Sequence, residues 1–292
     1  MKKSVLVSGA SGQVGTCLLE LSESSTQFEF DYMTRQELDL SSQESIKSVL
    51  HKPYDYIINA GAYTRVDQAE QEEELCMAIN AEALKHLAQY APANSCIIHF
   101  STDYVYNIDP GRPILETDDT KPRSVYGKSK LKGEEYLRTS KKEHIIIRTS
   151  WVYAAHGHNF VKSMLRLGKE REELGIVSDQ LGTPSYAPDI AYAVLDIIGK
   201  LESNNFDRQS SFGTYNFSNE GQTNWADFAR SIFLKSDIDC RVNNISTEGF
   251  NAPAPRPLWS VMSKDKIKSQ FDLKIPHWKD ALDRCLKILG ES

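Results

Sequence analysis

The chain has 292 residues with a net charge of −6, 40% hydrophobic residues and 25% charged residues. This composition is typical of a globular protein with a sizeable core, and the acidic charge argues against nucleic acid or an anionic membrane as a partner. No apolar run reaches the roughly 18 residues of a membrane span, and no secretory signal is expected at the start. Five scattered cysteines without a CxxC pair indicate reduced thiols in the cytoplasm.

The first predicted strand, at residues 4–8, leads into a glycine-rich turn and then into a helix-like pattern. The glycines of this turn are Gly9, Gly12 and Gly15. Such a turn between strand and helix lets the backbone approach a pyrophosphate, which the free N–H groups of the helix then bind. We therefore expect a dinucleotide site here; the alternative is a glycine-rich turn without a ligand.

The second predicted strand, at residues 28–33, ends where a site that prefers NAD usually has an acidic residue. Thr34 and Arg35 stand there instead. Arg35 can pair with a 2′-phosphate, and no carboxylate at residue 34 repels that phosphate. NADPH is therefore the expected cofactor, with NADH as the alternative, and a solvated Arg35 is the simplest competing interpretation. Asp39 begins the next loop, where it could reach the adenine, and a helix over residues 42–50 follows.

A third strand, at residues 55–59, is followed by small residues that leave room for a cofactor backbone. They are Ala60, Gly61 and Ala62, followed by Tyr63. One long helix is then predicted through Leu75 and Leu87. A fourth strand, at residues 95–100, brings Thr102 to the ligand edge of a parallel sheet, where it is a candidate hydrogen-bond donor to a substrate carbonyl.

A tyrosine and a lysine stand four residues apart in the next predicted helix, after a loop at residues 107–123. Of the thirteen tyrosines, only Tyr126 has this partner, Lys130. Residues at this spacing share one face of a helix. A nearby ammonium favours the phenolate and lowers the tyrosine pKa from its usual value of about 10, which makes proton transfer feasible. The competing interpretation is an incidental surface pair.

The rest of the chain continues to alternate between strands and helices. Because alternating strands and helices build parallel sheets, the sequence predicts an α/β fold with a doubly wound parallel sheet of the Rossmann type and a smaller α/β C-terminal lobe. The further strands are predicted at 145–148 and 213–218, and the further helices at 160–172, 188–201, 223–235, 263–269 and 277–289.

The predicted domains are a dinucleotide-binding part, residues 1–150, and a substrate-binding lobe, residues 151–185 and 219–292. The chain is expected to return to the first part around residues 186–218. Within the lobe, Arg256 lies in a proline-rich segment that must be extended, and it is a candidate ligand for an anion. His156 and His158 are too few to indicate a metal site, and a surface loop is the better interpretation.

Several stretches of the chain together resemble the extended short-chain dehydrogenase/reductases. These stretches include GASGQVG, NAGAYTRVDQAE, STDYVY, VYGKSKLKGEEYL, RTSWVYAAHGHNF, SDQLGTPSYAPDIA and PAPRPLWSVMS. Within that family the chain is similar to enzymes that reduce a 4-keto sugar on a thymidine diphosphate carrier. The resemblance implies NADPH-dependent reduction of the 4-keto group of dTDP-4-dehydro-L-rhamnose to dTDP-L-rhamnose, a step of cell-surface polysaccharide biosynthesis.

The resemblance also implies roles for individual residues. Tyr126 would protonate the carbonyl oxygen, and Lys130 would lower the tyrosine pKa and hold the nicotinamide ribose. Thr102, with its neighbour Asp103, would bind the substrate, and Trp151 would pack on the sugar. The family contacts to the cofactor fall on Gly12, Gln13, Val14, Asp39, Leu40, Gly61, Ala62 and Tyr63. A homodimer and Mg²⁺ are suggested by the family alone, and no metal ligands can be assigned.

Two other functions compete with a reductase. A sugar-nucleotide epimerase or dehydratase of the same fold is one, although dehydratases have a glutamate where Tyr104 follows Asp103. A non-catalytic module that binds NADP, like the regulatory β-subunit of methionine adenosyltransferase, is the other. The intact set of Thr102, Tyr126 and Lys130 favours an enzyme over this module.

Overall fold

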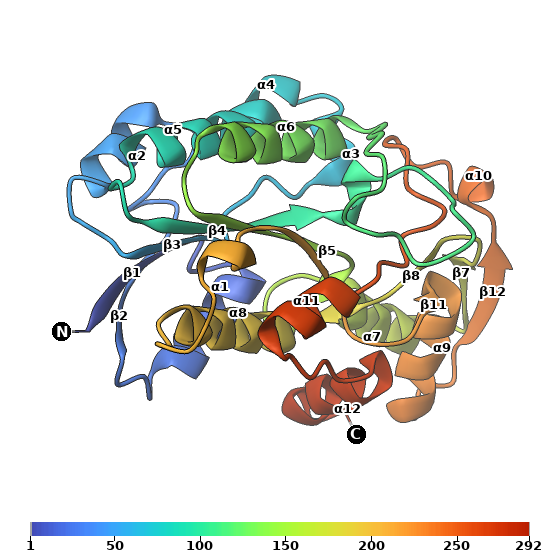
Figure 1. Cartoon of the computed structure of the whole chain (residues 1–292). Coiled ribbons are helices and arrows are strands. Elements are labelled where there is room, and N and C mark those ends of the chain that lie inside the picture. Colours follow the sequence, from blue (N-terminus) through green and yellow to red (C-terminus); the bar gives the residue numbers. More distant parts are fainter. Residues whose placement is uncertain (1, 292) are drawn as a thin grey trace.

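A six-stranded parallel sheet with helices on both faces forms the centre of the computed structural model, which describes residues 2–291 (Figure 1). The strand order β10-β5-β4-β3-β1-β2 places β1 inside the sheet, so that the chain winds outward from it in both directions. The predicted doubly wound parallel sheet is thereby confirmed. The strands are β1 (Lys3–Ser8), β2 (Phe28–Met33), β3 (Tyr56–Asn59), β4 (Cys96–Thr102), β5 (His144–Thr149) and β10 (Gly213–Phe217).

Alternating side chains on the strands supply two separate hydrophobic cores, one on each face of the sheet. Val5 and Val7 of β1 pack with the helices of one face, whereas Leu6 packs with those of the other. All three side chains are fully buried. One face is covered by α1 (Gln13–Ser22), α8 (Ala187–Leu201) and α11 (Asp265–Phe271), and the other by α2 (Gln43–Val49), α5 (Ala83–Tyr90) and α6 (Val125–Thr139).

The strand register brings the predicted site residues to one edge of the sheet. Ser8 at the end of β1 pairs with Met33 on one side and with Asn59 on the other. Thr102 at the end of β4 pairs with Thr149 of β5. Because parallel strands end at the same edge, the loops that follow them meet in one crevice, which is the usual ligand position in such folds.

The long helix predicted after the third strand runs without a break over residues 73–90, but it is not α-helical throughout. It begins as α4 (Glu73–Met77), widens into a π-helical segment (Ala78–Glu82) and continues as α5. The side chain of Asn80 within the widened turn accepts a hydrogen bond from Tyr63 N at 2.9 Å and donates to Tyr63 O at 3.0 Å. It also donates to Ser129 Oγ at 3.0 Å. π-Bulges of this kind are frequent at functional sites, and this one links the loop after β3 to α6.

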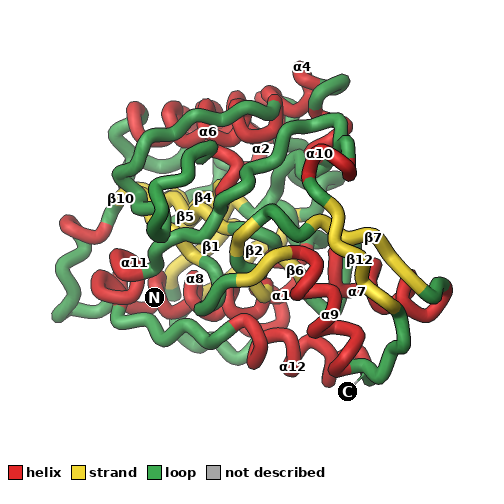
Figure 2. The backbone as a smooth tube through the Cα atoms, turned by 90° about the vertical axis from the view of Figure 1, so that its right-hand side faces the viewer, coloured by secondary structure: helices red, strands yellow, loops and turns green. Residues whose placement is uncertain are grey.

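The C-terminal helices α7 (Phe160–Glu170), α9 (Trp225–Lys235) and α12 (Trp278–Leu289) surround a third core. Beside them lies a parallel pair of strands, β7 (Glu173–Val177) and β12 (Arg241–Ile245), which was not predicted (Figure 2). Strand β12 reads Arg-Val-Asn-Asn-Ile, without the strict alternation of apolar and polar residues that predicts a strand, and none of its residues is buried. The division into a dinucleotide-binding part and a substrate-binding lobe stays a prediction.

The described part of the chain, residues 2–291, contains no helix with the length and apolar character that crossing a membrane requires. All five cysteines are free and buried. Burial raises the pKa of Cys96 to about 12, so this thiol stays protonated and unreactive at neutral pH.

Replacing Gly133 of α6 by alanine should destabilise the protein. A Cβ at this position would lie 2.2 Å from the Asn80 carbonyl oxygen, so either α6 or the π-helical segment must move. We expect the free energy of unfolding to fall by about 1–3 kcal/mol, and urea unfolding followed by circular dichroism measures the change.

Gly199 of α8 provides the matched control for this substitution. Nothing lies within 4 Å of a Cβ built there, and alanine is normally favoured over glycine in a helix by up to about 1 kcal/mol. Gly199→Ala should therefore leave the stability unchanged or raise it. Equal effects of the two substitutions would contradict the close contact between Gly133 and Asn80.

Candidate active site

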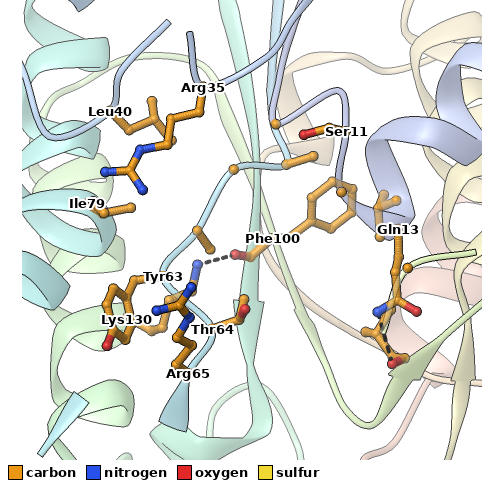
Figure 3. Close-up of a pocket in the computed structure, with 18 of the residues that line it drawn as sticks. Ser11, Gln13, Arg35, Leu40, Tyr63, Thr64, Arg65, Ile79, Phe100 and Lys130 are labelled. Carbon is orange, nitrogen blue, oxygen red and sulfur yellow. Dashed lines mark hydrogen bonds between the residues drawn. The ribbon is translucent and has the colours of Figure 1, made fainter. Parts of the chain in front are cut away.

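A cavity of about 580 Å³ opens at the carboxyl edge of the sheet (Figure 3). Its walls come from the turn between β1 and α1, from the loops after β2 and β3, from the ends of β4 and β5, and from α6. The predicted residues that line it are Gly9, Gly12, Gln13, Val14, Arg35, Asp39, Leu40, Ala60, Gly61, Ala62, Tyr63, Tyr126 and Lys130.

The glycine-rich turn fits the pyrophosphate of a dinucleotide. Gly9 has φ +72°, and a Cβ there would lie 2.5 Å from Gly61 N in the neighbouring loop. Gly15 does not line the cavity; a Cβ on it would lie 2.2 Å from Gly9 O. No side chain caps α1, and its first turn has no acidic residue. Its N-terminal N–H groups are therefore free for an anion.

Gln13 ties this turn to the loop that follows the short strand β6 (Val152–Tyr153). Its Oε1 accepts a hydrogen bond from Asn159 Nδ2 at 2.9 Å, and its Nε2 donates to Val152 O at 3.4 Å. His156 in this loop lies 3.3 Å from the Cys17 sulfur. Among residues 2–291 no three His, Cys, Asp or Glu side chains cluster closely enough to hold a metal.

Arg35 lies in the cavity wall with Asp39, whose pKa is lowered mainly by hydrogen bonds from Ser41 and to a smaller extent by the charge of Arg35. Thr34 does not reach this wall. Its N–H and its hydroxyl donate to Glu37 Oε2 at 2.8 and 2.9 Å, so a carboxylate occupies this turn although none stands at residue 34 itself. Glu37 was not predicted as part of this turn, although the spacing Thr-x-x-Glu is that of a capping box and could have revealed it.

Lys130 is buried, with 2% of its surface exposed. Its Nζ donates a hydrogen bond to Phe100 O at 2.6 Å and lies 3.3 Å from His99 Nε2. Burial lowers the pKa of Lys130 to about 8, and the nearby Glu134 carboxylate opposes this shift. Lys130 therefore carries most of its charge at neutral pH but loses it more readily than an exposed lysine.

Tyr126 lies in the same wall, and burial raises its pKa well above the ordinary value. The Thr102 hydroxyl opposes this effect, but it does not cancel it. The expected lowering of the Tyr126 pKa by Lys130 is not found in this structure, because the Lys130 ammonium turns to Phe100 and His99. Tyr126 therefore remains a protonated phenol at neutral pH, which suits a proton donor better than a proton acceptor.

Thr102 and Asp103 lie beside the cavity and do not line it. The Thr102 hydroxyl donates to Asp103 Oδ1 at 3.0 Å and accepts from Tyr104 N at 3.2 Å. Burial raises the pKa of Asp103 to about 6, and the hydrogen bond from Thr102 opposes this shift. As long as Asp103 is ionised, the single hydroxyl proton of Thr102 is held by that carboxylate.

Trp151, which was predicted to pack on the sugar, does not line the cavity. Its backbone has φ +50°, a strained conformation for a non-glycine residue. Its ring stacks on Trp225 with 3.7 Å between centroids, and Trp225 Nε1 donates to Gln180 Oε1 at 3.0 Å. A Cβ at Gly182 would lie 2.7 Å from the Trp151 ring. Sequence reasoning did not find Trp225, since no local pattern connects it to Trp151.

Arg256 does not line the cavity. Its guanidinium donates two hydrogen bonds to Asp67, at 2.9 and 2.7 Å, and one to Ala254 O at 2.9 Å. The expected free cation is therefore neutralised by Asp67. Arg65, which was not predicted, does line the cavity, and its guanidinium makes one hydrogen bond within residues 2–291, to Gln68 Oε1 at 3.2 Å (Figure 3).

A buried ion pair fixes α6 on the sheet. Arg148 of β5 donates to both carboxylate oxygens of Glu134, at 2.9 and 2.6 Å. Burial alone would raise the pKa of Glu134, but the bonds from Arg148 hold it below its ordinary value. Because Glu134 stands one turn after Lys130, this pair determines where Lys130 meets β4.

The model of the family described as the RmlD substrate binding domain matches residues 1–290. Among curated proteins, the dTDP-4-dehydrorhamnose reductase of Aggregatibacter actinomycetemcomitans is 38% identical over 95% of this chain and 96% of its own length. The spore coat polysaccharide biosynthesis protein SpsK of Bacillus subtilis (strain 168) is 36% identical over 97% of this chain and 96% of its own length. Among solved structures, a dTDP-4-dehydrorhamnose reductase from Bacillus anthracis strain Ames in complex with NADP has a TM-score of 0.90 at 34% identity, covering 99% of this chain and 100% of that chain.

The raised pKa of Asp103 predicts a pH-dependent loss of stability. Its value of about 6 lies above the ordinary 3.8, so the protonated form is favoured in the folded state. The stabilisation is complete below pH 3.8 and disappears as the pH rises through 6. The unfolding free energy of the wild type relative to Asp103→Asn should therefore fall by up to about 3 kcal/mol between pH 4 and pH 7. Thermal unfolding of both proteins across this range measures it, and a constant difference would contradict the assignment.

Proposed function

The chain belongs to the family of the RmlD substrate binding domain, and on that premise we propose that it is an NADPH-dependent reductase of dTDP-4-dehydro-L-rhamnose. The product is dTDP-L-rhamnose, a nucleotide sugar of polysaccharide biosynthesis. Support comes from the reductases that are similar to it over nearly the whole chain. The single structural observation that carries the proposal is the common cavity of the glycine-rich turn, Tyr126 and Lys130.

Different residues of the cavity would hold different parts of the cofactor. The turn at residues 9–15 and the N-terminus of α1 would hold the pyrophosphate. Arg35 would pair with the 2′-phosphate, and Lys130 would hold the nicotinamide ribose. NADPH supplies a hydride when bound, so the protein has only to provide a proton and to orient the two reactants.

Tyr126 provides the proton. The keto group gains a hydride at carbon and a proton at oxygen, which together make the alcohol. Because burial keeps Tyr126 protonated, it is ready to act as the general acid. By family resemblance the positive charge of Lys130 would stabilise the phenolate left behind; Lys130 lines the same cavity, although its hydrogen bonds in this structure go to Phe100 and His99. The Thr102 hydroxyl would donate a hydrogen bond to the substrate oxygen once its bond to Asp103 opens.

The substrate diphosphate needs local cations because the chain is acidic overall. Arg65 in the cavity wall is one, and Arg256 could serve only after its bidentate pair with Asp67 opens. Trp151, with Trp225 behind it, offers an aromatic face on which the sugar could pack.

The cytoplasm is the proposed location, and five free, buried cysteines support it. A homodimer and Mg²⁺ rest on the family resemblance alone. Within residues 2–291 no group of three metal-ligating side chains supports a Mg²⁺ site.

The decisive test is whether NADPH is consumed in proportion to the product. With pure protein and dTDP-4-dehydro-L-rhamnose, we expect the absorbance of NADPH to fall by one equivalent for each product formed. Tyr126→Phe removes the proton donor but keeps the ring, so turnover should fall by about 10²–10⁴-fold with the affinity for NADPH retained. Product without loss of absorbance would indicate an epimerase or dehydratase, and binding without turnover of any keto sugar nucleotide would indicate a binding module.

A second prediction concerns the choice between NADPH and NADH. Arg35 is the cation of the predicted 2′-phosphate site, whereas Glu37 places a carboxylate in the same turn. The wild type should have a higher kcat/KM with NADPH, and Arg35→Ala should lower that preference by about tenfold, as expected for one lost charge-assisted contact. Glu37→Gln is the matched control, because it removes the opposite charge and should raise the preference. A wild type that favours NADH would contradict this assignment.

A further inference from the structure

Beneath Lys130 lies a chain of buried polar side chains that the proposed reaction does not use. Ser8 Oγ donates to Asn59 Oδ1 at 2.6 Å, and Asn59 Nδ2 faces His99 Nδ1 at 3.1 Å. His99 Nε2 then faces Lys130 Nζ at 3.3 Å. Each of these four side chains is at most 2% exposed. Ser8, Asn59 and His99 are direct register partners on β1, β3 and β4, so the chain crosses the sheet in a straight line.

Lys130 has three N–H donors when it is charged. Phe100 O takes one of them at 2.6 Å, and His99 Nε2, 3.3 Å away, can take the second when the ring proton of His99 is on Nδ1. The third is left for the cavity, which Lys130 lines. His99 is suited to this task because burial, followed by the charge of Lys130, holds its pKa well below the ordinary value. A neutral imidazole has one acceptor nitrogen to offer.

The row of side chains Ser8, Asn59 and His99 can form a hydrogen bond with Lys130 in both charge states of the amine. In the orientation of Asn59 found here, Nδ2 faces His99, which puts the imidazole proton on Nε2, ready to donate to a neutral amine. When the Asn59 amide is turned by 180°, its oxygen accepts from His99 Nδ1–H, and Nε2 then accepts from the ammonium. The two ends of the amide have nearly the same shape, so this exchange needs no movement of the backbone.

We propose that His99 is a positioning residue for Lys130, held by Asn59 and Ser8, and that it fixes the Lys130 amine under the cavity in either charge state. The inference rests on the proposed function only in assuming that Lys130 serves the reduction. If His99 were merely a core residue with satisfied hydrogen bonds, its loss would cost stability but would not change the rate per folded molecule.

Two amide substitutions separate these roles, because each keeps one of the two bonds of His99. In His99→Gln the terminal amide reaches the position of Nε2 and keeps the contact with Lys130. In His99→Asn it reaches the position of Nδ1 and keeps only the contact with Asn59. Both substitutions leave one polar group without its partner, so their costs in stability should be similar.

We expect kcat to be higher in the variant that keeps the contact with Lys130. We measure kcat per mole of bound NADPH, so that unfolded protein does not count, together with KM for the keto sugar nucleotide. We expect kcat of His99→Asn to lie about tenfold or more below that of His99→Gln, since a misplaced group near the reacting atoms costs rate steeply. The two KM values should agree within about twofold. Equal kcat values, or a larger loss in His99→Gln, would overturn the proposal.

A binding cycle tests the same inference without turnover. The affinity for NADPH is measured by fluorescence for the wild type, His99→Asn, Lys130→Met and the double variant. His99→Asn should weaken binding several-fold in the wild type and add nothing in Lys130→Met, because it acts through Lys130. Equal weakening in both backgrounds, or none in either, would overturn the proposal.

If His99→Asn does not fold, Asn59→Ser replaces it in both experiments, because it removes the Nδ1 partner but keeps the imidazole. Absence of wild-type turnover with any keto sugar nucleotide would count against the proposed function. The binding cycle would still decide the role of His99.

Discussion

The site depends on how α6 is held against the sheet. The Glu134–Arg148 pair lies almost wholly inside the protein, with 0% and 3% of the two side chains exposed. Taking both charges out of water is costly, and breaking such a pair by removing one partner typically costs about 3–5 kcal/mol. Gly133, the residue before Glu134, allows α6 to touch the π-helical segment. The pair and this contact together place Tyr126 and Lys130 in one cavity wall.

Burial shifts three ionisable groups of the site in the directions that keep them neutral. The pKa of Tyr126 and that of Asp103 are raised, whereas that of Lys130 is lowered. In each case the main cause is loss of water around the charged form. A phenol that stays protonated is the form needed to give a proton to a carbonyl oxygen. The chemistry proposed here thus follows from packing as much as from residue type.

The sequence could predict those features of the fold and site that rest on neighbours along the chain. Apolar runs and their spacing located the strands of the central sheet, and β1 with its glycine turn was found because strand, turn and helix are contiguous. Lys130 was found because four residues separate it from Tyr126. The strand β12 was missed, since its polar residues become a strand only through pairing with β7.

The sequence by itself determined the order of the central-sheet strands along the chain, the glycine-rich turn and the spacing of Tyr126 and Lys130, because each depends on local pattern. Only the tertiary structure decided that Arg256 is neutralised by Asp67, 189 residues away, and that His99 reaches Lys130. It also reversed the expected shift of the Tyr126 pKa. Burial and long-range partners exist only in the packed chain, and a charge buried in the interior responds to them more strongly than to its neighbours in sequence.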